Sequence, residues 1–161
     1  MLPFLSPASG QIIILDLYPT SNILHIGIFL QLWDNHTQYF PVDSEVLKID
    51  YSPGKLLPAF LNNVGQENEK MTYSLYNEQI GLYCIQQIAG MIFRRLISNV
   101  KPSQYRPQGS KLGRILFGSR VDIYIPIITV PDANNRRLNY KNLLRMGQKI
   151  EAGKTIIGFY D

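Results

Sequence analysis

A glycine–serine pair, Gly118-Ser119, interrupts two strand-like runs in the last third of the chain. Glycine permits backbone conformations that are closed to other residues, so a second group can approach its carbonyl closely. The serine places a hydroxyl beside that carbonyl, where it could attack the preceding peptide bond. Local sequence alone favours a simpler reading, a bulge or turn between strands. After the pair, Val121, Ile123 and Ile125 alternate with Arg120, Asp122 and Tyr124, the period of a half-buried strand.

Two histidines and one cysteine are the other side chains with reactive chemistry. His36 follows an apolar run and stands beside Asp34, so it is either a surface residue or a general acid or base at a cleft. His25 and Trp33 belong to that run, and we expect both in the core. Cys84 lies in another apolar run, which predicts a buried, inert thiol and excludes an internal disulfide. A structural zinc site takes about four Cys or His ligands, so we expect no metal.

The positive charge of the chain is concentrated in one tract. The formal net charge is +4, and no acidic residue lies between Glu78 and Asp122. Basic clusters serve phosphates on lipid or nucleic acid, unless they form an ordinary solvated face. Nucleic acid would use tyrosines as stacking groups, but tyrosines are expected in a β-rich protein anyway, and no phosphate-binding glycine loop is present. We therefore expect no nucleic-acid partner. The basic residues are Arg94, Arg95, Lys101, Arg106, Lys111, Arg114 and Arg120, and the tyrosines are Tyr105, Tyr124 and Tyr140.

Short strands with turns between them account for most of the sequence pattern. The runs at 71–77 and 80–87 are expected to form a hairpin about Asn77-Glu78-Gln79. Residues 89–97 fit a helical turn or a strand, and 101–109 and 131–142 are expected to be surface loops. The predicted class is therefore predominantly β with minor helices (α+β), a single-domain barrel or sandwich. Strands are predicted at 11–17, 23–33, 45–51, 71–77, 80–87, 114–117, 120–125 and 155–160.

Length and composition suit one folded domain. A chain of 161 residues with 45% hydrophobic content can form a core without disulfides or metal. No segment reaches the roughly 18 consecutive apolar residues of a membrane span. The N-terminus also lacks the pattern of a signal peptide. We expect a single domain over 1–161, cytoplasmic and peripheral to a membrane.

The motifs of the chain, taken in order, resemble the phosphatidylserine decarboxylase family. Ser6-Pro7-x-x-Gly10 is similar to the family's Ser-Pro-x-Asp-Gly turn, and Asp34-x-His36 followed by Pro41-Val42 is similar to its Asp-x-His…Pro segment. Smaller matches follow at fitting places, and the resemblance, to the short bacterial and archaeal type, covers nearly the whole chain. The other matching stretches are Pro53-Gly54-Lys55, Asn68-Glu69, Ile88-Ala89-Gly90, Arg94-Arg95, the processing region from Gly113 to Asp122, and a C-terminal hairpin from Gly147 to Thr155.

This resemblance implies a pyruvoyl-dependent decarboxylase that makes phosphatidylethanolamine and CO₂ from phosphatidylserine. Ser119 would attack the Gly118 carbonyl to give an ester, and β-elimination would split the chain into a β fragment (1–118) and an α fragment (119–161). The new N-terminus would be a pyruvoyl group, which serves as the electron sink for decarboxylation. By the same resemblance His36 would handle protons or orient the carboxylate. The residues expected to contact the substrate phosphate are Arg94, Arg95 and Arg120.

Three positions depart from the family's pattern. The acidic residue that assists self-cleavage is replaced by Ser9, the basic residue three after the histidine by Tyr39, and the usual glycine after Pro-Val-x by Ser44. Asp34 or Asp122 could stand in for the missing carboxylate. Two alternatives therefore stay open: an unprocessed, non-catalytic homologue that binds anionic lipid or a protein partner, and a soluble amino-acid decarboxylase on the same scaffold. A homo-oligomer is also left open.

Overall fold

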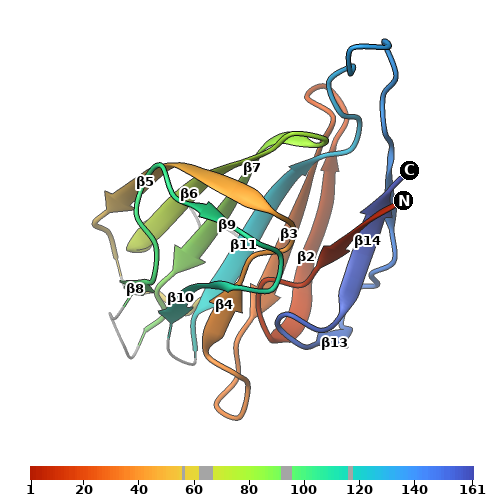
Figure 1. The fold of residues 1–161 in the computed structure, drawn as a ribbon. Helices are drawn as coiled ribbons and strands as arrows, with labels where there is room; N and C mark the ends of the chain where they lie inside the picture. Colours follow the sequence, from red (N-terminus) through yellow and green to blue (C-terminus); the bar gives the residue numbers. More distant parts are fainter. Residues whose placement is uncertain (56, 62–66, 92–95, 116–117) are drawn as a thin grey trace.

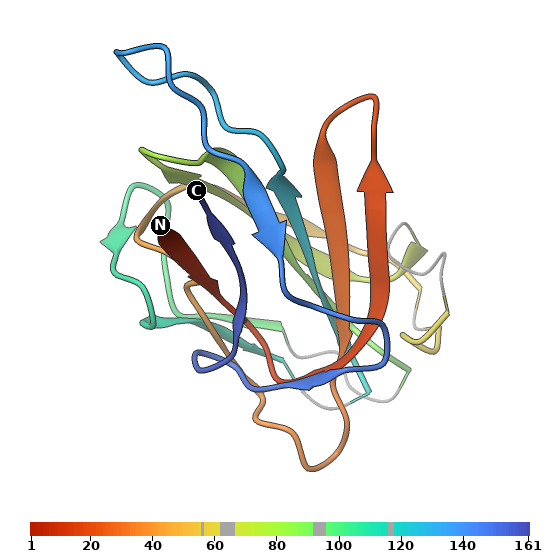
Figure 2. The ribbon, with the colours of Figure 1, turned by 90° about the vertical axis from the view of Figure 1, so that its right-hand side faces the viewer.

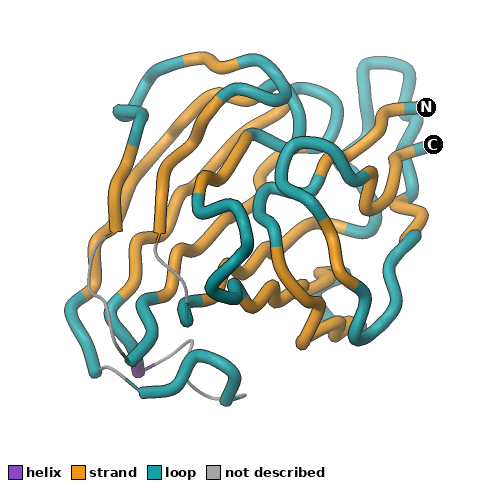
Figure 3. The backbone as a smooth tube through the Cα atoms, turned by 90° about the horizontal axis from the view of Figure 1, so that it is seen from below, coloured by secondary structure: helices purple, strands orange, loops and turns teal. Residues whose placement is uncertain are grey.

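Strands form nearly all of the regular structure of the chain (Figures 1 and 3). The computed structural model describes residues 1–55, 57–61, 67–91, 96–115 and 118–161. Its strands are β1 (Leu2–Leu5), β2 (Gly10–Tyr18), β3 (Ile23–Phe29), β4 (Thr37–Tyr39), β5 (Ser44–Ser52), β6 (Lys70–Asn77), β7 (Gly81–Ile88), β8 (Leu96–Ser98), β9 (Tyr105–Arg106), β10 (Lys111–Ile115), β11 (Arg120–Pro126), β12 (Tyr140–Asn142), β13 (Lys149–Ile150) and β14 (Ile156–Tyr160).

The strands are arranged in one large and two small sheets. The large sheet has eight antiparallel strands in the order β13-β2-β3-β11-β7-β6-β5-β9. The small sheets have the orders β1-β14-β12 and β4-β10-β8. Pairing of β1 with β14 brings the two ends of the chain together (Figures 1 and 2). The large sheet is open, because its edge strands β13 and β9 stand at opposite ends of the order.

The prediction of a predominantly β chain is confirmed, and its details need two corrections. Helix is almost absent from the described residues, where only Glu67 is helical, so the minor helices are fewer than predicted in those parts. The strands also do not close into a barrel. The described residues include no helix that is long and apolar enough to cross a membrane.

One hydrophobic core joins the three sheets. Phe4 of β1 shows how, because its ring meets the ring of Tyr83 on β7 edge to face with 5.7 Å between centroids. It makes similar contacts with Tyr140 and Tyr160 of its own sheet, at 6.4 and 6.3 Å. Edge-to-face aromatic pairs contribute about 0.5–1.5 kcal/mol beyond the area they bury. The aromatic cluster therefore fixes the small sheet β1-β14-β12 against the large one.

The central strand β11 is buried more completely than its sequence predicts. It pairs with β3 on one side and β7 on the other. Its apolar residues are buried as expected, but Arg120 and Asp122 on the supposed solvent face are buried too. The half-buried strand was therefore the wrong description. Polar and apolar residues do alternate along β11, but the polar ones face other polar groups inside the protein.

Most predicted strands are found within one or two residues of their expected bounds, and the hairpin of β6 and β7 is confirmed. The main error is the long run 23–33, because β3 ends at Phe29 and the chain then turns. Asp34 stabilises that turn by accepting the Gln31 N–H through Oδ2 at 2.8 Å. Trp33 consequently stands 73% exposed, so its assignment to the core was wrong.

The remaining predictions hold in part. His25 is a core histidine as predicted. Cys84 is only half-buried, and burial raises the pKa of its thiol, which keeps the reactive thiolate scarce. The loop predicted at 101–109 contains the short strand β9, and the loop predicted at 131–142 ends in β12.

A candidate active site at one end of the central sheet

Five strands of the large sheet end in register. Across β2, β3, β11, β7 and β6 one row consists of Gln11, Phe29, Arg120, Ile88 and Lys70. The residues one position beyond this row are Gly10, Leu30, Ser119, Ala89 and Glu69. We call the place that they mark the Ser119 end of the sheet. Motifs that are scattered through the sequence therefore meet at one place.

Backbone hydrogen bonds on either side of the Gly118–Ser119 peptide bond join these two residues to the end of β3. The Gly118 N–H donates to the Leu30 carbonyl at 2.8 Å, and the Leu30 N–H donates to the Ser119 carbonyl at 3.0 Å. Gly118 has a φ of 75°, in the left-handed region that favours glycine. Ser119 is 1% exposed. The predicted turn and the predicted reacting pair are thus the same structure, a peptide with a defined orientation whose serine is buried and whose glycine is half-buried.

Gly90 lies against the other side of this peptide. A Cβ atom at position 90 would stand 1.8 Å from the Gly118 carbonyl oxygen and 2.6 Å from its carbon. Only glycine fits so close to the carbonyl that the serine would attack. The sequence marked Ile88-Ala89-Gly90 as a motif, but no sequence argument gave Gly90 this role.

Asn68 holds the segment that carries Gly90. Its amide nitrogen Nδ2 donates to the Ala89 carbonyl at 2.8 Å and to the Leu57 carbonyl at 2.8 Å. Its Oδ1 accepts the Leu57 N–H at 3.1 Å, and the side chain is buried. A buried amide with all these bonds made stabilises one arrangement of three segments. Its position next to Glu69 in a matching motif was the only sequence signal for this role.

Arg120, the residue after Ser119, forms a buried ion pair with Asp122. Nε donates to Oδ1 at 2.7 Å and Nη2 to Oδ2 at 3.0 Å, and both side chains are at most 1% exposed. Nη1 donates to the carbonyls of Ala59 and Leu61 at 3.3 and 3.0 Å. The guanidinium is therefore directed at partners inside the protein, whereas the sequence predicted a phosphate contact. The signal that could have indicated the pair is the spacing of two residues, which puts both side chains on one face of a strand.

His25 extends this polar network across the sheet. Its Nε2 bonds Asp122 Oδ2 at 2.7 Å and its Nδ1 bonds the Tyr18 hydroxyl at 2.9 Å. Burial, and then the charges of Asp16 and Asp122, raise the pKa of Tyr18, so its hydroxyl keeps its proton. Both Asp122 oxygens are thus engaged, and this aspartate cannot approach Ser119 as a free carboxylate.

Ser9 and Tyr39 lie together at the turn between β1 and β2. The Ser9 hydroxyl accepts the Ala152 N–H at 2.8 Å and is buried. The Tyr39 N–H donates to the Pro7 carbonyl at 2.9 Å, and its ring covers Gly153. Ser9 precedes β2, and β3 lies between β2 and β11. Two strand spacings, about 10 Å, therefore separate the backbones at Ser9 and Ser119.

A hollow of about 330 Å³ opens beside Ser9. Asp34, Trp33 and Lys154 are among the residues that line it. The structure thus brings together two of the predicted self-cleavage residues, Ser9 and Asp34. Asp34 also holds its own turn through the Gln31 N–H, as described above.

His36 reaches this end of the molecule through a small sheet. It precedes β4, and its carbonyl accepts the Ile115 N–H at 3.1 Å. Ile115 is the last residue of β10, the strand that leads toward Gly118. Among the described residues, no three His, Cys, Asp or Glu side chains are grouped as metal ligands.

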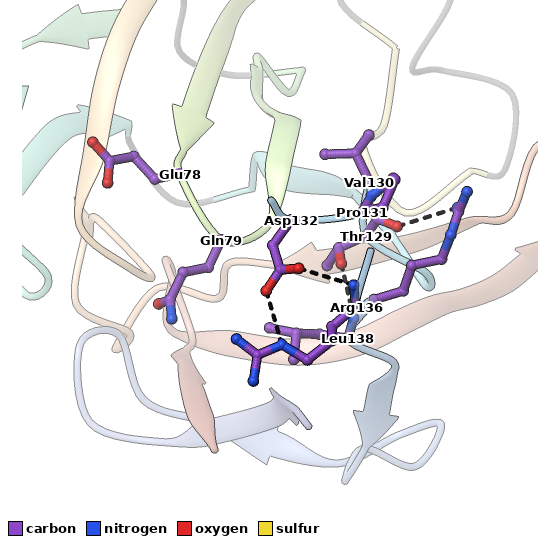
Figure 4. Close-up of a pocket in the computed structure, with 9 residues that line it drawn as sticks. Glu78, Gln79, Thr129, Val130, Pro131, Asp132, Arg136 and Leu138 are labelled. Carbon is purple, nitrogen blue, oxygen red and sulfur yellow. Dashed lines mark hydrogen bonds and ion pairs between the residues drawn. The ribbon is translucent and has the colours of Figure 1, made fainter. Parts of the chain in front are cut away.

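The remaining predicted basic residues and a second hollow are not part of the Ser119 end of the sheet as the structure describes it. Arg94 and Arg95 fall outside the described residues. Of the remaining basic tract, Lys101, Lys111 and Arg114 are exposed. A larger hollow of about 600 Å³ lies at the opposite end, between the β6–β7 turn and the loop that follows β11 (Figure 4). It contains an exposed ion pair of Asp132 and Arg136, 3.1 Å apart, and none of the predicted site residues.

Comparison with known proteins gives one consistent result. The profile of the phosphatidylserine decarboxylase family matches residues 8–158. A phosphatidylserine decarboxylase proenzyme of Ralstonia pickettii is 32% identical over 98% of this chain and 70% of its own length. One of Carboxydothermus hydrogenoformans is 34% identical over 96% of this chain and 70% of its own length. One of Pelagibacter ubique is 34% identical over 82% of this chain, and the match spans 56% of that protein. No solved structure matches the chain.

Proposed function

The chain belongs to the phosphatidylserine decarboxylase family, and we propose that it is a pyruvoyl-dependent carboxy-lyase that cleaves itself between Gly118 and Ser119 and converts phosphatidylserine to phosphatidylethanolamine and CO₂. One observation carries the proposal. Leu30 bonds both Gly118 and Ser119, Gly90 packs closely against the Gly118 carbonyl, and Ser119 is buried. A peptide held in this way is prepared for attack by its own serine, because a defined geometry replaces a random search.

The atoms and electrons of the self-cleavage reaction balance without an oxidant or a reductant. The Ser119 hydroxyl adds to the Gly118 carbonyl carbon, the C–N bond breaks, and residue 119 becomes an ester with a free amine. Loss of the Cα proton of residue 119 then expels the Gly118 carboxylate and leaves a dehydroalanine. Water replaces the nitrogen of that residue, ammonia leaves, and a ketone remains at the new N-terminus.

The position of Ser119 fits a pyruvoyl group. Such a group supplies an electron sink for the carbanion that loss of CO₂ creates. It would stand at the start of β11, where the Arg120–Asp122 pair fixes the next residue. We assign His36, near the end of β10, to proton transfer or to orientation of the substrate carboxylate. We assign Arg94 and Arg95 to the substrate phosphate, because a guanidinium binds phosphate oxygens bidentately.

The two fragments are proposed to stay together as one domain. The α fragment, 119–161, contains β11, β12, β13 and β14. β11 pairs with β3 and β7, and β14 pairs with β1, so both ends of the α fragment are held by the β fragment, 1–118. The packing of a small sheet over the large one supports the family's layered, sandwich-like architecture.

A second candidate is an unprocessed homologue with a binding function. The observation that favours it is Ser9, which replaces the family's acidic residue and uses its hydroxyl to accept the Ala152 N–H. Without a carboxylate near Ser119, cleavage would be slow or absent. The test of the main proposal separates the two.

The intact mass of purified, aged protein tests the proposal. We expect two fragments, 1–118 and 119–161, whose masses together equal that of the 18.4-kDa chain plus one water and minus one ammonia. Ser119→Ala should remain whole, since it has no hydroxyl to attack with. A wild-type protein that stays at full length for days favours the unprocessed homologue. Cleavage that persists in Ser119→Ala would mean that another reaction splits the chain.

Gly90→Ala should slow self-cleavage by about 100-fold, because a displacement of about 1 Å at a reacting centre has an effect of that size. The new methyl cannot stand 1.8 Å from the Gly118 oxygen, so the reacting peptide has to move. A time course of fragment formation measures the effect. Gly109→Ala is the control, because its methyl would meet nothing within 4 Å and the substitution adds only the backbone strain of a φ of 82°. If both variants cleave at the parent rate, Gly90 does not position the peptide.

A further inference from the structure

Large apolar side chains stand exposed on three loops around the Ser119 end of the sheet. Leu32 and Trp33 are 61% and 73% exposed in the loop that follows β3. Phe60 and Met91, from two other loops, are each 59% exposed. Scattered exposed apolar residues are normal on proteins. Here, however, they are grouped on the loops that surround one peptide.

The contacts of these loops place them at this end. The first follows Leu30, which bonds the Gly118–Ser119 peptide. The second is held by the bonds from Arg120 to its backbone, and the Phe60 ring meets Phe29 edge to face at 6.2 Å. Met91 directly follows Gly90. In Figures 1 and 2 the orange loop between β3 and β4 extends furthest at the lower end of the molecule.

Basic groups accompany the exposed tryptophan. The Lys149 ammonium lies 5.9 Å from the centre of the Trp33 ring. Lys154 lines the same hollow as Trp33, with Asp34 and Glu151 as the acidic groups nearby. Lys154 and Glu151 form an exposed pair at 3.5 Å, which contributes little in water. Tryptophan next to lysine is the combination that favours the boundary between lipid headgroups and acyl chains.

We propose that these three loops dock the Ser119 end of the sheet on a phospholipid bilayer that carries anionic lipid. This inference rests on the proposed function and specifies how the site meets its substrate. The reacting groups of phosphatidylserine belong to the headgroup, so a site that takes it from a bilayer has to lie at the interface. Inserted apolar loops provide the binding, and lysine near the surface adds attraction to anionic headgroups.

Trp33 is the only tryptophan of the chain, so its fluorescence reports on this loop alone. On vesicles of phosphatidylserine and phosphatidylcholine we expect its emission to shift to shorter wavelength. We also expect it to be quenched when the lipids carry bromine on their acyl chains. Leu32→Glu should weaken vesicle binding by about tenfold or more, because a charge replaces an inserted side chain. Leu82→Glu is the matched control, since Leu82 is 63% exposed near the opposite end of β7.

The outcomes separate this inference from the proposed function. If the protein sediments with vesicles but Trp33 emission does not change, or if Leu82→Glu weakens binding as much as Leu32→Glu, another surface binds the membrane. If no binding occurs, the inference fails outright. The mass spectrum of the same sample tests self-cleavage independently. A processed protein without a Trp33 shift overturns only the docking surface, and an unprocessed protein with the shift overturns only the enzyme.

Discussion

Aspartate at position 9 together with histidine at position 39 should accelerate self-cleavage by up to about 10⁴-fold, the size of effect that an orienting carboxylate has in a serine–histidine relay. The two substitutions return an acid and a base to the positions where the family resemblance implies them. The structure makes the pair plausible as a unit, because the Tyr39 N–H bonds the carbonyl of Pro7 in the same turn that carries Ser9. This bond therefore joins the strand that carries Tyr39 to the turn that carries Ser9.

The local geometry accepts the two new side chains. A carboxylate at position 9 can accept the Ala152 N–H that the Ser9 hydroxyl accepts now at 2.8 Å. Histidine is smaller than tyrosine, so it fits the space beside Gly153 that the Tyr39 ring occupies. The two are needed together, since about 10 Å separates the backbones at Ser9 and Ser119 and a single aspartate does not span that distance. A buried carboxylate beside a protonated histidine is also less costly than one alone.

A time course of intact mass on freshly purified protein measures this prediction. The double variant should form fragments within the time in which the parent chain stays mostly whole. Ser9→Asp alone should leave the rate near that of the parent chain, and Tyr39→His alone should give a smaller gain than the pair. Adding Ser119→Ala to the double variant should stop cleavage completely. Equal rates for the parent and the double variant would mean that Ser9 and Tyr39 do not limit the reaction.

The sequence predicted the strands well because their pattern depends on local periodicity. The hairpin of β6 and β7 needs only two alternating runs and a turn, and it was found where expected. Trp33 was misplaced because an apolar run does not show where a strand leaves its sheet. That point is fixed by the bonds of Leu30 to β11 and of Asp34 to its own turn.

The site was predictable as a list of residues and not as an arrangement. Gly118, Ser119 and the small motifs could be read from their order. Their convergence depends on a register in which five strands end together, and register is a property of pairing across the whole chain. The role of Gly90 depends on a close approach between segments far apart in sequence. Arg120 was placed on the open face of a half-buried strand, as a contact for the substrate phosphate, because no local pattern shows that its strand is covered on both faces.

Arg120→Met should lower the free energy of unfolding by about 3–5 kcal/mol, because it leaves the Asp122 carboxylate buried without its main partner. Asp122 is fully buried, and among the described residues His25 is the only other side chain that bonds it. Urea unfolding measures the change. Arg106→Met, which removes a half-buried arginine with one long hydrogen bond to Gln104, should change the free energy of unfolding by about 0.5 kcal/mol or less.

A double variant tests whether the effect comes from the unpaired charge. Arg120→Met with Asp122→Leu should recover part of the lost stability, since well-packed apolar residues can replace a buried ion pair. Recovery stays incomplete because His25 loses its Asp122 partner, which costs about 1–3 kcal/mol for a buried polar group left unsatisfied. If Arg120→Met alone is as stable as the parent, the ion pair does not hold β11 in place. Its proposed part in fixing the residue after Ser119 would then have to be abandoned, because the same guanidinium bonds that stabilise the strand are the ones that orient its first residue.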